Sequence, residues 1–190
     1  ANSDDYGLLV VGDTQLDQAG RTAEWRAAYE EFVASVQRGG IPLGTVTLEE
    51  PIQVGAQPAG LDITPDGTGL YVANSGGNNI SVVSLARRVE LRKVAVPTDT
   101  HSNDRPYSIA IANNSGSIVA FGGRAMELDL GTGESTHRTD AGPYGLTTPR
   151  TYVRASGDRS TITFAMSGTS AGILLVYRTS TNTFTQRNIS

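Results

Sequence analysis

Apolar and polar residues alternate in short runs along most of the chain, and turn-forming residues separate the runs. The clearest example spans residues 58–85, where Leu61 and Ile63, and later Leu70 and Val72, stand two positions apart. The separators read Pro-Asp-Gly-Thr-Gly and Ser-Gly-Gly-Asn-Asn. Because a period of two indicates β-strands and such separators indicate tight turns, this stretch predicts antiparallel strands.

One segment near the N-terminus has a different period. Six apolar residues recur there at helical spacing: Trp25, Ala28, Tyr29, Phe32, Val33 and Val36. A Gly-Gly-Ile-Pro sequence at residues 39–42 would end the helix. The pattern therefore predicts an α-helical insertion at residues 13–40. Its apolar stripe either packs on the nearest sheet or contacts a partner through Trp25, Tyr29 and Phe32.

Comparison of segments reveals an internal repeat. Pro58–Ile63 is similar to Pro106–Ile111, and both are similar to residues 143–148. A turn and three further alternating runs follow each segment, and the last run is more polar than the others. Each repeat therefore predicts a four-stranded meander with the length of a propeller blade, at about residues 52–96, 98–139 and 140–188.

The first repeat carries a recognisable motif. It reads Pro-x-Gly-Leu-x-Ile-x-Pro-Asp-Gly-x-x-Leu-Tyr-Val-Ala-Asn and continues with Asn-Asn-Ile-Ser-Val-Val. This motif resembles the blade signature of the YVTN family of β-propellers, and residues 105–134 resemble it less closely. Phe121 and the two glycines after it stand where the family has Val-Ala/Thr-Asn. The resemblance implies a propeller in a protein of a family that is often exported, so we expect a periplasmic, secreted or cell-surface location.

We expect a single all-β domain over residues 1–190, with the helical insertion inside an incomplete first blade. That blade would have its second strand at residues 8–11, its third at 45–48 and its fourth at 52–54, and would lack its first strand. Propellers typically have about four to eight blades, so three complete blades do not close a ring. We therefore expect a protein partner, additional copies of the chain, or the remainder of a longer chain to complete the propeller.

The composition excludes several classes of function. The net charge is -4 and comes from interspersed charges, which disfavours a nucleic-acid partner. The chain has no cysteine, so disulfides, thiolate catalysis and cysteine-ligated zinc are excluded. Because it has only two histidines, we expect no haem, copper or multi-ligand zinc site, and no bound cofactor or metal. No apolar run approaches the roughly 20 residues of a membrane-spanning helix.

Candidate binding residues gather on one predicted face. The loops that enter the first strand of each blade, and those between second and third strands, emerge on the same side of a propeller. This face would collect Asn74, Asn78, Asn79, Asp99, His101, Asn103, Asp104, Arg105, Arg124 and Tyr144. His101, with Asp99 and Asp104 nearby, could act as a general base, but a solvated loop histidine is the simpler account. A cation site at Asp99, Asn103 and Asp104 is disfavoured because the spacing matches no calcium loop.

Two functions remain open from the sequence. The first is a non-catalytic binding or scaffold subunit, because a rigid ring of sheets that presents variable loops suits recognition. The alternative is a propeller enzyme, either lactonase-like or a periplasmic oxidoreductase subunit, with its site on the loop face around His101. We favour the first, since the spacing of the titratable residues fixes no set of catalytic groups.

Overall fold

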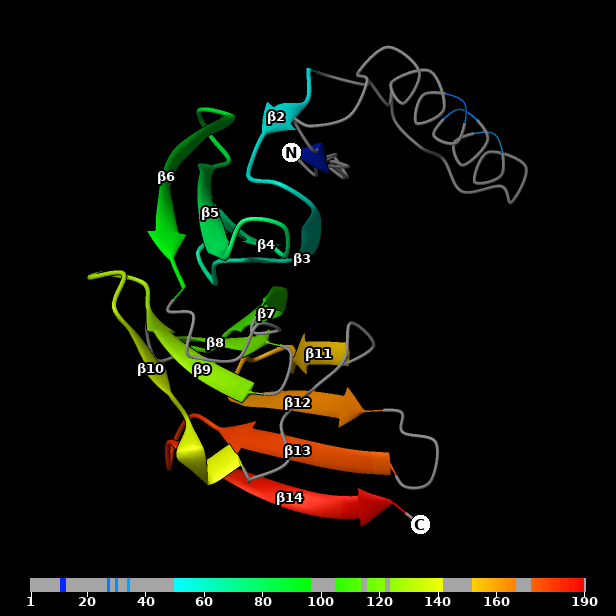
Figure 1. The fold of residues 1–190 in the computed structure, drawn as a ribbon, viewed down its shortest axis with the longest axis vertical. Helices are drawn as coiled ribbons and strands as arrows, with labels where there is room; N and C mark the ends of the chain where they lie inside the picture. Colours follow the sequence, from blue (N-terminus) through cyan, green and yellow to red (C-terminus); the bar gives the residue numbers. More distant parts are fainter. Residues whose placement is uncertain are drawn as a thin grey trace, which may run out of the picture.

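The fold is that of a computed structural model of the 190-residue chain. It describes residues 11–12, 27, 30, 34, 50–96, 105–113, 116–121, 124–141, 152–166 and 172–189. These residues form three four-stranded antiparallel sheets and one short pair of strands (Figure 1). The all-β class and the four-stranded antiparallel sheets predicted from the sequence are confirmed. Among the described residues, no helix has the length and apolar composition needed to cross a membrane.

Each sheet is a meander whose strands follow one another in chain order. The first sheet contains β3 (Pro58–Ile63), β4 (Gly69–Asn74), β5 (Asn79–Ser84) and β6 (Val89–Ala95). The second sheet contains β7 (Pro106–Ile111), β8 (Gly116–Phe121), β9 (Arg124–Asp129) and β10 (Ser135–His137), followed by the 3-10 helix η1 (Thr139–Ala141). The third sheet contains β11 (Tyr152–Ala155), β12 (Thr161–Met166), β13 (Gly172–Arg178) and β14 (Thr183–Ile189).

The third sheet starts later than the repeat predicts. The sequence comparison placed its first strand at residues 143–148, but the strand that pairs with β12 is β11. Ala155 pairs with Ile162, as Ile63 pairs with Leu70 in the first sheet, and both pairs enclose a turn of the same length. β11 is therefore the counterpart of β3, and the proline-led match was wrong as a strand assignment. Residues 142–151 lie outside the described residues.

The segment before the first sheet also differs from its prediction. β1 (Val11–Gly12) pairs in parallel with β2 (Ile52–Gln53). In the expected incomplete blade, a third strand at residues 45–48 would separate these two strands, and neighbouring strands would be antiparallel. Most of the predicted helical insertion, including Trp25, Tyr29 and Phe32, lies outside the described residues. The insertion therefore stays a prediction.

The central strands of the first sheet are buried on both faces. In β4 every residue from Leu70 to Asn74 is buried, although successive side chains point to opposite faces. One face packs on the second sheet, and on the other face Leu70 and Val72 pack against Ile52 and Val54. Since both faces are apolar, this sheet requires a neighbour on each side.

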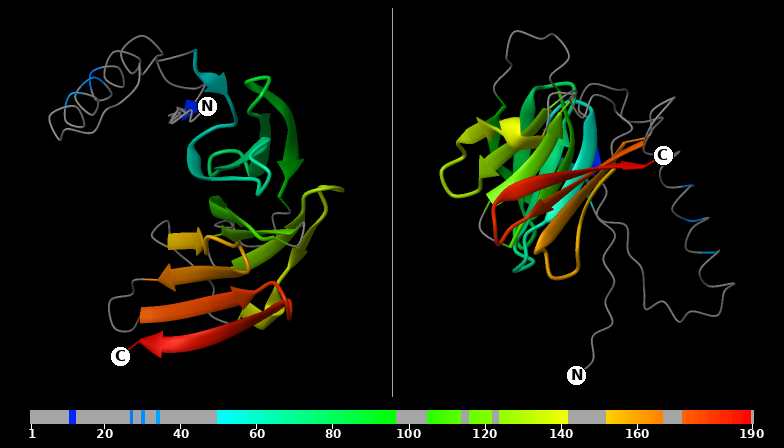
Figure 2. Two further views of the ribbon diagram at one scale, coloured as in Figure 1. Left: turned by 180° about the vertical axis from the view of Figure 1, so that it is seen from behind. Right: turned by 90° about the horizontal axis from the view of Figure 1, so that it is seen from below.

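The second sheet lies between the first and the third (Figures 1 and 2). Ile109 and Met126 pack against the first sheet, and Ala110 and Ala125 pack against the third. The first strands β3, β7 and β11 lie side by side, whereas β6, β10 and β14 form the outer edges. Face-to-face packing of successive meanders with their first strands innermost is the arrangement of propeller blades.

A half-buried arginine joins the second and third sheets at their outer strands. Arg138, whose side chain is 10% exposed, forms salt bridges with Glu127 (2.6 Å) and Asp140 (2.8 Å). It also donates hydrogen bonds to the side chain and the main-chain oxygen of Asn182, and its guanidinium lies over the rings of Tyr177 and Phe184. Hydrogen bonding to Asp140 raises the pKa of Arg138, although burial opposes the shift, so the group stays charged. One side chain thus ties two sheets together.

We expect the Arg138→Lys variant to unfold more easily than the wild-type chain. Lysine keeps the charge but cannot make the forked contacts to Asp140 and Asn182, so the free energy of unfolding should fall by about 2 kcal/mol. Urea denaturation would measure this loss. The matched control, Arg87→Lys in an exposed turn, should change stability by less than about 0.5 kcal/mol. An equally small effect at Arg138 would contradict its role as a link between the sheets.

Candidate functional site

Two residues of the predicted loop face, Asn74 and Asn79, form a hydrogen-bond network within the first sheet. Asn74 is completely buried, and its Nδ2 donates to Asn79 Oδ1 (2.8 Å) and Ser81 Oγ (2.8 Å). The main-chain nitrogen of Gly55 donates to the same Ser81 oxygen. A Cβ at Gly55 would lie 2.5 Å from Asn74 Nδ2, so only glycine fits there. This network gives Asn74 and Asn79 a structural role, and a ligand on the surface cannot contact Asn74.

Only three of the other predicted binding residues lie in the part of the chain that the structure describes. Asn78 is half-buried with a positive φ of 48° in the turn after β4, where asparagine is favoured. Arg105 is exposed just before β7, and Arg124 begins β9, opposite Phe121. The remaining candidates lie outside the described residues: Asp99, His101, Asn103, Asp104 and Tyr144. Their binding role, and the general-base hypothesis for His101, stay predictions.

A pocket of ≈ 250 Å³ lies at the other end of the first strands. Asn74 pairs with Pro58 at the start of β3, whereas the pocket is lined by Leu61 and Asp62 near its end. Ile109 of β7 and Arg159 after β11 also line it. The pocket is therefore on the opposite side of the molecule from the predicted loop face. We did not predict this pocket from the sequence, because we considered only the loops at one end of the strands.

Asp62 and Arg159 form the polar part of this pocket. Arg159 donates from Nη1 to Asp62 Oδ2 (2.8 Å) and from Nη2 to Asp62 Oδ1 (3.2 Å). Arg159 Nη1 also donates to the carbonyl oxygen of Ile111, whose nitrogen donates to Asp62 Oδ2 (2.8 Å). The side chains of Asp62 and Arg159 are each 21% exposed. The pair thus connects the first sheet to the third across the end of β7.

The turn that carries Arg159 is built by an aspartate. Asp158 accepts hydrogen bonds from the hydroxyls of Ser156 and Ser160 and from the nitrogen of Ser160. Thr64, Asp66 and Thr68 make the same contacts in the first sheet. Arg159 has a φ of 56°, and its counterpart Gly67 has a φ of 70°. The turn geometry is therefore shared, and the arginine side chain is the addition that reaches Asp62.

The charged groups of Asp62 and Arg159 in this pocket are paired with each other. Both oxygens of the Asp62 carboxylate accept hydrogen bonds from Arg159, and Oδ2 also accepts one from the main-chain nitrogen of Ile111. Among the described residues there is no cluster of three or more histidine, aspartate or glutamate side chains that could hold a metal ion. Asp62 had no sequence signal because it occupies an alternate polar position of a strand. Its partner is 97 residues away along the chain.

Comparison with known proteins supports the architecture alone. No protein-family model matches the chain, and no curated protein matches it significantly. Hydrazine synthase from Kuenenia stuttgartiensis is 22% identical, with a TM-score of 0.59, over 75% of this chain and 40% of that one. A protein from Lactobacillus plantarum is 17% identical, with a TM-score of 0.52, over 77% of this chain and 48% of that one. The chain thus spans less than half the length of these two structures.

The meanders, their face-to-face packing and these structural neighbours define a β-propeller-type fold. The propeller fold expected from the sequence is therefore confirmed. Membership of the YVTN family stays a resemblance, because no family model matches.

We expect Asp62→Asn to loosen the third sheet from the first. The amide cannot pair with the Arg159 guanidinium as a carboxylate does, so the free energy of unfolding should fall by about 1.5–3 kcal/mol. Urea denaturation would measure the loss, and amide hydrogen exchange should accelerate at Ile111. Glu134→Gln, at an exposed position in the turn before β10, is the matched control. Equal stability of the two variants would show that the pair does not hold the sheets together.

The Asp158 turn should make stability depend on acid pH. Hydrogen bonds from the Ser156 hydroxyl and from Ser160 lower the pKa of Asp158 from 3.8 to about 2. Because the folded pKa is the lower one, this stabilisation is fully present above pH 3.8 and is lost as the pH falls towards 2. Thermal unfolding of wild type and Asp158→Asn between pH 6 and pH 2 checks it. The difference in Tm between the two chains should shrink over that acid range, and a constant difference would contradict the assignment.

Proposed function

We propose that this chain is a non-catalytic binding or scaffold module, and that further blades complete its propeller. The observation that carries the proposal is that the first strands at both ends of the row of sheets present exposed apolar side chains, with no described strand packed over them. At one end Leu61 and Ile63 of β3 are 48% and 40% exposed. At the other end Tyr152 of β11 is 69% exposed. Large apolar side chains at both ends favour a chain that works within an assembly.

The partial cover of the first sheet supports the same proposal. Leu61 and Ile63 lie opposite Val72 and Leu70 and share their face, and β2 covers only the outer part of it. A first strand of the preceding blade would cover the inner part. From the sequence, we expect the first blade to lack this strand. The source of the strand would be a partner chain, another copy of this chain, or a further part of a longer chain.

The cellular location belongs to the proposal as well. The blade motif of the first repeat resembles a family whose members are often exported or at the cell surface. We therefore propose a periplasmic, secreted or cell-surface location. We propose a binding module because the carboxylate in the described pocket, that of Asp62, is paired with Arg159, and no unpaired catalytic group lines that pocket.

Light scattering on the isolated 190-residue chain, followed by limited proteolysis, tests the proposal. We expect a defined mass above the 20.0 kDa of one chain, or a monomer that is readily cleaved. Leu61→Glu should reduce any association, because it places a charge on the uncovered inner surface. Val89→Glu is the matched control on the outer strand, at a residue that is 41% exposed. A stable monomer that resists cleavage would overturn the proposal.

A further inference from the structure

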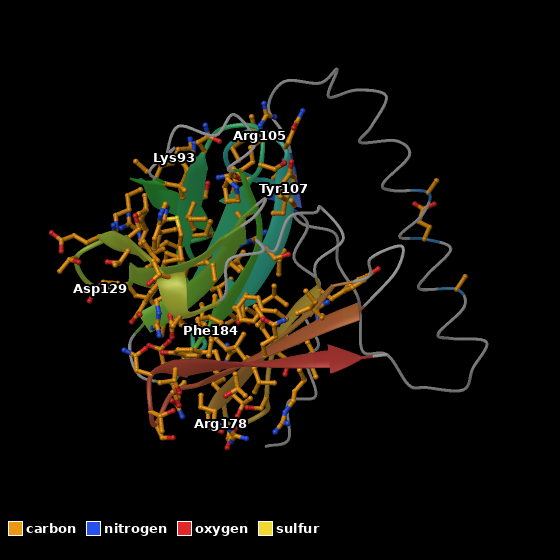
Figure 3. All side chains as sticks on the ribbon, turned by 60° about the horizontal axis from the view of Figure 1, so that its bottom comes forward. Lys93, Arg105, Tyr107, Asp129, Arg178 and Phe184 are labelled. Atoms are coloured by element: carbon orange, nitrogen blue, oxygen red, sulfur yellow. The ribbon has the colours of Figure 1, made fainter. Side chains whose placement is uncertain are left out.

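One face of the third sheet has no neighbour among the described residues. Phe164 and Tyr177 point towards the second sheet, so the residues that alternate with them point to the opposite face. We call this opposite surface the open face. The open face includes the side chains of Tyr152, Arg154, Leu174, Val176, Arg178 and Arg187. Figure 3 shows Arg178 and Phe184 on opposite sides of the sheet, which agrees with this assignment.

The open face corresponds position by position to a covered face of the first sheet. The register places Ala165 and Leu174 where the first sheet has Ala73 and Ile80. Val176 likewise corresponds to Val82. In the first sheet these three residues are buried beneath the second sheet, at 0%, 0% and 7% exposure. Their counterparts on the open face are only half-buried. The same apolar centre is thus present, and continuing the same packing would place another sheet over it.

The first strand departs from this correspondence at two positions. Gly60 lets β7 approach closely, because a Cβ there would lie 2.7 Å from Ser108 Cα and from the Tyr107 carbonyl oxygen. The third sheet has Tyr152 at the equivalent position. Asp62 accepts a hydrogen bond from the main-chain nitrogen of Ile111 in β7. The third sheet has Arg154 at the position equivalent to Asp62. A strand therefore cannot pack on the open face as β7 packs on β3, because Tyr152 occupies the space that Gly60 leaves free. A strand that covers Arg154 must also carry a negative charge, whereas β7 faces the carboxylate of Asp62.

The charge of the open face is uniform. Arg154, Arg178 and Arg187 are all exposed, and none of the described residues at these register positions is acidic. Among the described residues, the Arg154 guanidinium donates a hydrogen bond to the carbonyl oxygen of Val153 (3.0 Å). The chain as a whole carries a net charge of -4. A basic surface on an acidic protein selects an acidic partner through electrostatic complementarity.

We infer that the open face binds a β-sheet of a partner protein, and that this sheet carries a carboxylate opposite Arg154 and leaves space for Tyr152. This inference rests on the proposed function. The partner has an apolar centre that covers Leu174 and Val176 and an acidic inner strand. A β-sheet is the occupant because the open face continues the established packing between the first, second and third sheets.

A second copy of this chain does not fit the requirement. To continue the ring, a copy would bring the uncovered face of its first sheet, whose inner strand presents Leu61 and Ile63. These apolar side chains would bury the Arg154 guanidinium without a counter-charge, which is strongly unfavourable. The carboxylate must therefore come from a sequence other than that of residues 1–190.

Chemical labelling of the native assembly tests the inference. The full chain would be purified with its bound partners through an affinity tag from the organism that encodes it. Phenylglyoxal would label arginines and tetranitromethane would label tyrosines, in the assembly and in the isolated chain. We expect Arg154, Arg187 and Tyr152 to react in the assembly at less than about a tenth of their rate in the isolated chain, because a buried interface excludes the reagents. Arg87, far from the open face, should react equally in both.

A charge reversal gives the matched comparison. Arg154→Glu should weaken partner binding at least about 30-fold, because it places like charges together. Arg87→Glu makes the same change of charge in an exposed turn and should bind as the wild type does. Thermal unfolding of both isolated variants checks that they are folded. A photoreactive benzoylphenylalanine in place of Tyr152 should cross-link to a partner strand that contains aspartate or glutamate.

Each other outcome overturns the inference in a distinguishable way. Full labelling of Tyr152 and Arg154 in an intact assembly would contradict it but leave the proposed function standing. Cross-linking only between copies of this chain would identify a second copy as the occupant. Protection of the isolated chain by vesicles of phosphatidylglycerol and phosphatidylcholine would identify a membrane surface instead. A protease-resistant monomer with no bound partner would overturn the inference together with the proposed function.

Discussion

The burial of both faces of the central strands of the first sheet is the constraint on which this structure depends. β4 and β5 are short, and nearly all of their side chains are buried whichever face they point to. A sheet of this kind is stable only between two others, because each uncovered face would leave apolar side chains in water. The repeated meander therefore leads to a row of sheets in which the second sheet packs against the first and the third.

Polar links set how the sheets sit on one another, since apolar packing alone is not directional. Arg138 fixes the outer strands of the second and third sheets through Glu127, Asp140 and Asn182. Asp62 and Arg159 fix the inner strands of the first and third sheets at the end of β7. Both arginines are held by forked contacts, whose geometry lysine cannot reproduce. These links turn a stack of similar sheets into one defined arrangement.

The sequence predicted the repeated four-stranded meander well, because period-two alternation and turn residues are local signals. It failed where the outcome depended on distant residues. The match at residues 143–148 relied on a proline motif, whereas β11 is identified by its pairing with β12. Asn74 was predicted to bind at the surface, but its environment is set by Gly55 and Ser81. The pair of Asp62 and Arg159 carries no local signal, since each residue alone fits an ordinary strand or turn.

Two positions on the first strands show how similar sheets acquire different neighbours. Gly60, Ser108 and Tyr152 occupy the first position, and Asp62, Ala110 and Arg154 occupy the second. The small residues of the first two sheets allow the next strand to approach, and β7 does approach Gly60 closely. The third sheet keeps the apolar centre but changes both of these positions. Because the centre supplies most of the hydrophobic stabilisation and the two positions supply selectivity, a repeat can keep its fold while it changes its partner.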